Sequence, residues 1–215
     1  RKPWCPEKDK FLIIDCWGNF DYFKMKPEGR EPGALVPMPV HLFRARLDGL
    51  EAAVHAHRED IAEAVKGDLR RDLEALPKNN VVVLENGAHL ARARADEFWR
   101  HLSTDGIGFL RGVIAPLLRA RSGADFKALR FETEVVELGT AVLANNKEAF
   151  EAIKQSVQAQ AAELPLTVNI VARERELIDA IQFEDWWLTP TEGKLRSLIE
   201  RLAPLMRLRQ ARRDP

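Results

Sequence analysis

The chain is poor in cysteine and has no long apolar run. Both features limit the classes of protein to which it can belong. Its 215 residues include two cysteines, Cys5 and Cys16. They form no Cys-x-x-Cys pair of the kind found in structural zinc sites, and they are too few for a disulfide-rich secreted domain. No stretch approaches the roughly 20 apolar residues of a membrane span, and no apolar signal region follows Arg1. These features favour a soluble cytoplasmic protein with no membrane partner.

The chain also lacks an excess of either charge. Lysine and arginine together number 33, as do aspartate and glutamate, so the formal net charge is zero. The chain as a whole therefore has no general attraction for DNA, and any DNA contact has to be local. The phosphate-binding loop of a motor is missing too, because Gly193-Lys194 is followed by Leu195 instead of serine or threonine. We expect no ATP site within this chain.

Few residues have the spacing of a metal site. His55 and His57 lie two apart in a predicted helix, so their side chains point about 200° apart and cannot share an ion. We expect both on the surface. Asp185, Glu192 and Lys194 superficially match the Asp…Glu-x-Lys pattern of Mg²⁺-dependent nucleases. That pattern needs both carboxylates on adjacent strands, whereas Glu192 is expected in the first turn of a helix, so we predict no catalytic, cofactor or metal site here.

The first forty residues read as the end of one domain followed by a linker. Residues 11–14 form a continuous apolar run that ends at Asp15, which is typical of a short buried strand. A lone strand cannot form a sheet, so we expect its partners upstream of Arg1 and residues 1–26 to complete a domain cut mid-way. Asp15 either caps the turn or has a role linked to that domain. Residues 27–40 are too rich in proline and glycine for a helix or strand and are predicted to be an interdomain linker.

Residues 41–215 have the apolar spacing of helices. From Leu47 to Leu76 the apolar residues recur by threes, fours and one seven until Pro77, which predicts one long helix or two end to end with Gly67 as the weak point. Residues 81–84 fit either a strand or a helix start. A helix over residues 103–121 must bend or restart at Pro116.

The helix that begins near Asp125 carries the widest apolar face and is predicted to be the most buried, the hub of the domain. Its apolar residues are Phe126, Leu129, Phe131, Val135, Val136, Leu138, Val142 and Leu143. Two amphipathic helices follow, one before and one after Pro165. Thr189-Pro190-Thr191-Glu192 predicts a capping box with Thr189 as N-cap, and Pro204 predicts a break in the last helix. The fold class is therefore mainly α, a multi-helix bundle-like domain preceded by a short orphan strand.

Several segments resemble the restriction (R) subunit of type I restriction-modification enzymes. Residues 5–23 are similar to the stretch after that family's last helicase motif, which reads as a Lys-Asp-Lys-Phe turn, an apolar strand ending in Asp, then Gly-Asn-Phe and a second aromatic. The likeness continues in order through residues 42–48, 73–77, 114–117, 130–131 and 195–198. Each piece alone is weak, and their collinearity carries the resemblance. Pro204 and the end of the chain at Pro215 depart from the family pattern.

The resemblance implies that the strand closes the second RecA-like motor domain and that the helices dock the R subunit onto the modification core. The partners would be the methyltransferase and specificity subunits, with DNA reached through the full complex. The complete protein would be an ATP-dependent endonuclease that uses ATP and Mg²⁺, with its nuclease at the other end of the polypeptide. We expect this segment itself to be non-catalytic.

One charge asymmetry stands out near the C-terminus, and we expect it to bind a partner or phosphates unless it is an ordinary solvated helix face. Its candidate binding residues are Lys194, Arg196, Arg201, Arg207, Arg209 and Arg212. The neighbouring Trp186-Trp187 pair either locks the preceding loop onto the core or anchors a partner. A free-standing helical adaptor or regulator is the main alternative function, and an autonomous nuclease using Asp185, Glu192 and Lys194 is the third.

Overall fold

The computed structural model describes residues 36–121, 123 and 125–209. Residues 36–215 form one unit, separate from residues 1–35. The predicted strand, Asp15 and both cysteines lie outside the described residues. The described part is helical and contains no strand, as the fold-class prediction required for this region. None of its helices is long and apolar enough to cross a membrane.

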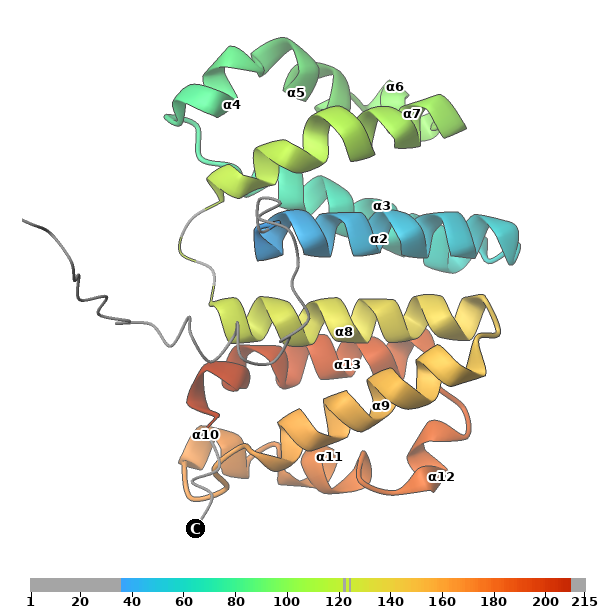
Figure 1. The fold of residues 1–215 in the computed structure, drawn as a ribbon, viewed down its shortest axis with the longest axis vertical. Coiled ribbons are helices and arrows are strands. Elements are labelled where there is room, and N and C mark those ends of the chain that lie inside the picture. Colours follow the sequence, from blue (N-terminus) through green and yellow to red (C-terminus); the bar gives the residue numbers. More distant parts are fainter. Residues whose placement is uncertain (1–35, 122, 124, 210–215) are drawn as a thin grey trace, which may run out of the picture. The chain divides into compact units, whose positions relative to one another are not determined.

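The first two helices of the described residues form an antiparallel hairpin instead of one rod (Figure 1). Helix α2 (Met38–His55) begins before the predicted start at His41, because Pro39 fits the first turn, where its missing N–H is not needed. The chain turns at His57, whose φ of 54° is left-handed. The His57 and Arg58 amides bond back to Val54 and Ala53, and α3 (Glu59–Glu74) then runs alongside α2. The weak point predicted at Gly67 is wrong, since Gly67 lies inside α3.

Short helical pieces follow up to residue 120. They are α4 (Val81–Glu85), α5 (Gly87–Arg94), α6 (Asp96–Arg100), α7 (Thr104–Phe109), a π-helical turn η1 (Leu110–Ile114) and a 3₁₀ helix η2 (Ala115–Ala120). The segment at 81–84 is thus helical. Ser103 caps α7, and Pro116 lies in the first turn of η2, so the predicted restart at this proline is confirmed.

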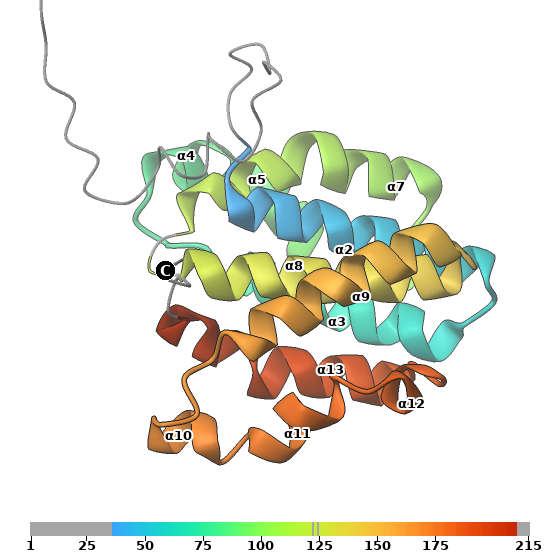
Figure 2. The same cartoon turned by 60° about the horizontal axis from the view of Figure 1, so that its bottom comes forward.

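Helix α8 (Phe126–Leu143) is the hub, as predicted. It packs against α2, α9 (Lys147–Ala162), α13 (Glu192–Arg201) and the 3₁₀ helix η3 (Ala203–Leu208), and α9 crosses it obliquely in Figure 2. Asp125 caps its start. Phe131, Val135 and Leu138 are buried, but Phe126 in the first turn is 49% exposed, so its predicted burial is wrong.

The C-terminal helices differ from prediction in their starts. Two short helices, α10 (Asn169–Ala172) and α11 (Arg175–Ala180), replace the one expected after Pro165, and α12 (Glu184–Trp187) precedes α13. The N-cap of α13 is Thr191, whose hydroxyl accepts the Lys194 amide at 3.3 Å, so the box centred on Thr189 is wrong. Glu192 lies in the first turn as predicted. The predicted break at Pro204 is confirmed by the change to η3.

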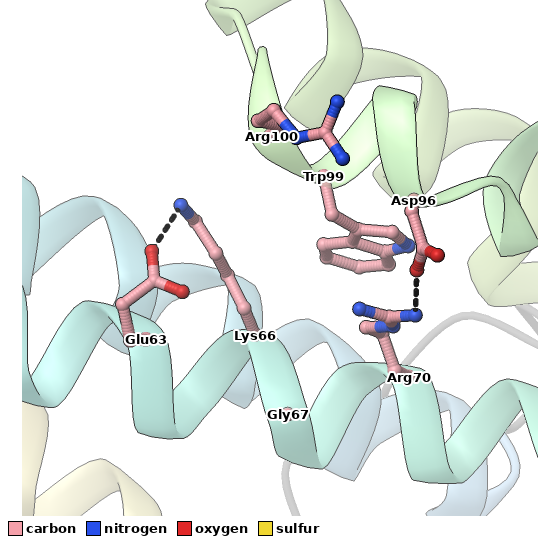
Figure 3. A pocket seen from close by; sticks show the side chains of 7 residues that line it. All are labelled: Glu63, Lys66, Gly67, Arg70, Asp96, Trp99 and Arg100. Atoms are coloured by element: carbon pink, nitrogen blue, oxygen red, sulfur yellow. Dashed lines mark hydrogen bonds and ion pairs between the residues drawn. The ribbon is translucent and has the colours of Figure 1, made fainter.

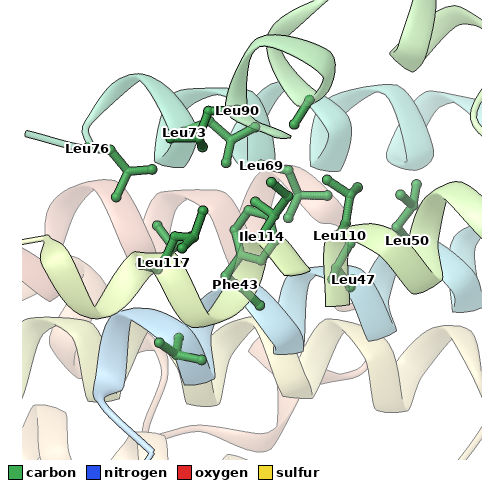
Figure 4. Close-up of a cluster of buried hydrophobic side chains, with 14 of the residues drawn as sticks. Phe43, Leu47, Leu50, Leu69, Leu73, Leu76, Leu90, Leu110, Ile114 and Leu117 are labelled. Carbon is green, nitrogen blue, oxygen red and sulfur yellow. The ribbon is translucent and has the colours of Figure 1, made fainter. Parts of the chain in front are cut away.

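The apolar residues gather in two clusters on either side of the α2–α8 contact. Helices α2 to η2 build the first (Figure 4), whose fully buried members include Phe43, Leu47 and Leu110. The segments from α8 to η3 build the second. Gly49 lets α2 and α8 approach closely, because a Cβ there would lie 3.2 Å from the Thr140 hydroxyl oxygen.

Truncation of Leu110 should be costly because its side chain is fully buried in the first cluster. We expect Leu110→Ala to lower the free energy of unfolding by about 2–5 kcal/mol. Leu84→Ala on α4, where the leucine is 65% exposed, should change it by less than about 0.5 kcal/mol. Urea denaturation followed by circular dichroism measures both, and equal effects would contradict the core assignment.

Candidate partner-binding surface

Most cations of the predicted basic surface are already paired within the domain. The Lys194 ammonium donates to the Trp186 carbonyl oxygen at 2.6 Å. Arg196 pairs with Glu192 at 3.0 Å and lies 3.5 Å from Asp68 on α3. These contacts tie α13 to its own neighbours, so the charges of Lys194 and Arg196 also serve the fold.

The remaining predicted cations divide into paired and free. Arg201 pairs with Glu174 at 2.6 Å, and Arg209 pairs with Glu163 at 2.7 Å. Arg212 lies outside the described residues. Arg207 is exposed and has no carboxylate within ion-pair distance in the part of the chain that the structure describes. Arg207 is therefore the predicted cation most accessible to a partner.

The tryptophan pair holds the chain before α13. Trp187 is 3% exposed and its indole N–H donates to the Ile181 carbonyl at 2.7 Å. Trp186 packs against it edge to face, and the Lys194 ammonium lies 5.1 Å from the Trp186 ring centroid. Of the two interpretations of this pair, the geometry agrees with the one that locks the loop onto the core.

Two of the three nuclease-like residues are paired with other groups. Asp185 is exposed on α12, while Glu192 is paired with Arg196 and Lys194 with Trp186. His55 and His57 are both exposed at the end of α2, as predicted. No cluster of three or more histidine, cysteine or carboxylate side chains suited to a metal occurs within residues 36–209 where they are described.

A groove of about 680 Å³ lies between α3, α8, α13 and the loop before α13. The face of α8 forms its floor with Val135, Val136, Gly139, Val142 and Leu143. Ile61 and Val65 extend the apolar lining on the α3 side, as Leu195 and Ile199 do on the α13 side. Leu188 at the rim is 78% exposed. This volume and this mixture of apolar and polar residues are typical of binding sites.

A partly buried ionic network forms part of the groove lining. Arg46 on α2 donates to Asp72 on α3 and to Glu132 on α8, and Arg121 donates to Asp72 at 2.8 Å. The Arg46 Nε atom is buried without a hydrogen-bond partner among the described residues. Burial raises the pKa of Glu132; Arg46 opposes this shift and Asp72 adds to it. The network therefore joins helices of the two apolar clusters while holding one carboxylate in an unfavourable environment.

A second pocket, of about 430 Å³, lies between α3 and α6 (Figure 3). Its cations have partners, since Lys66 pairs with Glu63 and Arg70 with Asp96. Trp99 is 3% exposed and donates its indole N–H to the Ala93 carbonyl. Because its ring is almost fully covered, we consider the groove along α8 the better candidate.

The sequence indicates that Arg46 and Asp72 are buried charges, but it does not indicate which residues they pair with. Arg46 falls three residues after Phe43 and next to Leu47, and Asp72 adjoins Leu73, so both charges stand on apolar helix faces. A charge at such a position usually has a buried partner. The partners themselves are 26 and 86 residues apart in the chain, and no local pattern pairs them.

Comparison with protein-family models, with curated proteins and with solved structures found no match to this chain.

Removal of the Asp72 charge should destabilise the domain strongly, because it leaves Arg46 and Arg121 without their shared carboxylate. We expect Asp72→Asn to lower the free energy of unfolding by about 3–5 kcal/mol. Asp185→Asn, at an exposed aspartate, is the matched control and should be nearly neutral. Denaturant titration of both variants measures the difference, and a neutral Asp72→Asn would show that the network does not stabilise the fold.

The raised pKa of Glu132 predicts a pH dependence of stability. The folded state holds this proton more tightly than the unfolded chain, so the free energy of unfolding falls as pH rises from the ordinary glutamate pKa through the raised one. Glu132→Gln should remove this part of the slope, whereas Glu148→Gln, at an exposed residue of α9, should retain it. Denaturation midpoints between about pH 4 and about pH 7 test this. Identical slopes in all three proteins would contradict the assignment.

Proposed function

We propose that this chain is the C-terminal assembly region of the R subunit of a type I restriction enzyme. In this role it docks a motor and nuclease onto the methyltransferase–specificity core and performs no catalysis itself. The observation that carries the proposal is the domain plan: a compact helical unit begins at residue 36, at the end of the proline-rich segment. A proline-rich segment followed by a helical domain is the order that the collinear resemblance leads us to expect.

The positions of the resembling segments support the same proposal. They are part of the bundle and not of its surface loops alone: residues 42–48 lie in α2, 114–117 in η1 and η2, 130–131 in α8 and 195–198 in α13. A shared helical scaffold would place its matching residues in such elements, because packing constrains them most. The ATP-driven and DNA-cleaving steps, with their ATP and Mg²⁺, belong in this proposal to domains upstream of the chain.

A free-standing helical adaptor is the second candidate, and the mixed groove of about 680 Å³ favours it equally. The gene upstream of Arg1 distinguishes the two. Nuclease and helicase motifs there support the R subunit, and a start codon close to Arg1 supports the adaptor.

Reversal of Arg207 in the full-length subunit should weaken assembly with the methyltransferase–specificity complex. The residue is exposed and unpaired within the described residues, so Arg207→Glu should leave folding intact and raise the Kd about threefold at low salt, with a smaller effect at high salt. Arg209→Glu is a poor probe because it would place a carboxylate against Glu163. Lys78→Glu, at an exposed lysine between α3 and α4, is the control. Pull-down at two salt concentrations measures the effect, and equal binding of both variants would place the docking surface elsewhere.

A further inference from the structure

The ion pair between Asp68 and Arg196 crosses the groove from one wall to the other. Asp68 belongs to α3 and Arg196 to α13, and a carboxylate oxygen of Asp68 lies 3.5 Å from the Arg196 guanidinium. The two helices otherwise make few contacts, since α3 packs on α2 and α13 packs on α8. The pair is therefore an important tie between two walls that pack little on each other.

Both members of this pair have a second partner on their own helix. Asp68 also pairs with Arg71, one turn further along α3. Arg196 also pairs with Glu192, at 3.0 Å, one turn earlier in α13. Separation of Asp68 from Arg196 thus leaves neither charge unpaired, and the large cost of an uncompensated charge is avoided.

Water has access to this pair. The Arg196 side chain is 34% exposed, and its distance to Asp68 is longer than its distance to Glu192. A partly exposed ion pair contributes little to stability and is screened by salt. The pair can therefore open by rotation of two side chains while the helices stay in place.

The same arrangement recurs at the start of α3. The Arg58 guanidinium donates to the Asp60 carboxylate at 2.9 and 2.7 Å. The pKa of Arg58 is raised chiefly by Asp60, and Glu192 across the groove adds to this shift. Glu192 is itself paired with Arg196. Both attractions across the groove thus join charges that already have a partner close by in the chain.

The pair of Asp68 and Arg196 lies above the apolar floor formed by α8. Arg46 on α2 binds Asp72 and Glu132 together, which places these residues of α3 and α8 at one level. Asp68 and Val136 are each one turn from that level. They lie in the same direction from it, because α3 runs antiparallel to α8 (Figure 1). Val136 lines the groove and is partly exposed, so it lies beneath the pair.

We propose that Asp68 and Arg196 form a gate over the floor of the groove. In the closed state the two side chains are paired across the groove, as they are in this structure. In the open state Asp68 keeps Arg71 and Arg196 keeps Glu192, and small solutes reach Val136. The gate is a property of this domain and does not depend on the proposed function.

The reactivity of a cysteine on the floor reports the state of the gate. The full chain carries Val136→Cys, with Cys5 and Cys16 replaced by serine, and is treated with N-ethylmaleimide, a small neutral reagent. Asp68→Asn should raise the labelling rate about threefold at low salt, as expected for the loss of a partly exposed ion pair. Salt at about 1 M, where the Debye length is about 3 Å, should raise the rate of the parent protein similarly and that of Asp68→Asn little.

Two controls separate opening of the gate from a general loosening of the fold. Asp185→Asn, at an exposed aspartate of α12, should leave the labelling rate of the floor cysteine unchanged. Asp68→Asn should leave the labelling rate of a cysteine at Glu148, which is exposed on α9, unchanged. Melting curves identify the variants that fold.

Removal of the second partner gives an independent comparison. Arg196→Gln should raise the labelling rate as much as Asp68→Asn does, and the double variant should raise it no further, because each change removes the same pair. Either single variant is sufficient for the test if the other does not fold. An unchanged rate at the floor cysteine after either substitution would overturn the proposal, as would effects that multiply in the double variant.

Discussion

Close packing of α2 against α8 is the constraint on which the rest of the domain depends. These helices come from opposite halves of the described chain, and each contributes to a different apolar cluster. Gly49 permits the close approach, and Arg46 crosses the contact to reach Glu132. Together with the ion pair between Arg196 on α13 and Asp68 on α3, this contact fixes the position of one half against the other.

The groove is a consequence of that arrangement. Helix α3 packs on α2 and helix α13 packs on α8, and the ion pair between Arg196 and Asp68 links the two flanking helices. Gly139 brings α13 close, since a Cβ there would lie 3.3 Å from Leu195 Cδ1. Three helices that each satisfy a separate packing requirement thus leave a groove of mixed apolar and charged lining between them.

The zero net charge of the chain is accompanied by many ion pairs within the domain. Many arginines find a carboxylate inside the domain, including ones that local sequence would assign to an open basic surface. Arg196, Arg201 and Arg209 are examples, with partners on α3, before α11 and after α9 respectively. Of the predicted binding arginines within the described residues, only Arg207 has no such partner there.

The sequence by itself determined the helical class, the hub helix from Asp125, the break at Pro204 and the start of the helical unit near the prolines. These follow from apolar periodicity and from the backbone chemistry of proline and of capping residues, which act within a few positions. It did not determine the turn at His57, because a left-handed conformation at a histidine depends on the antiparallel packing that follows it. The pairing of Arg46 with Asp72 and Glu132, the partners of the C-terminal arginines and the groove itself were decided only by the tertiary structure. Each joins residues far apart in the chain, and local patterns contain no information about which distant helix faces meet.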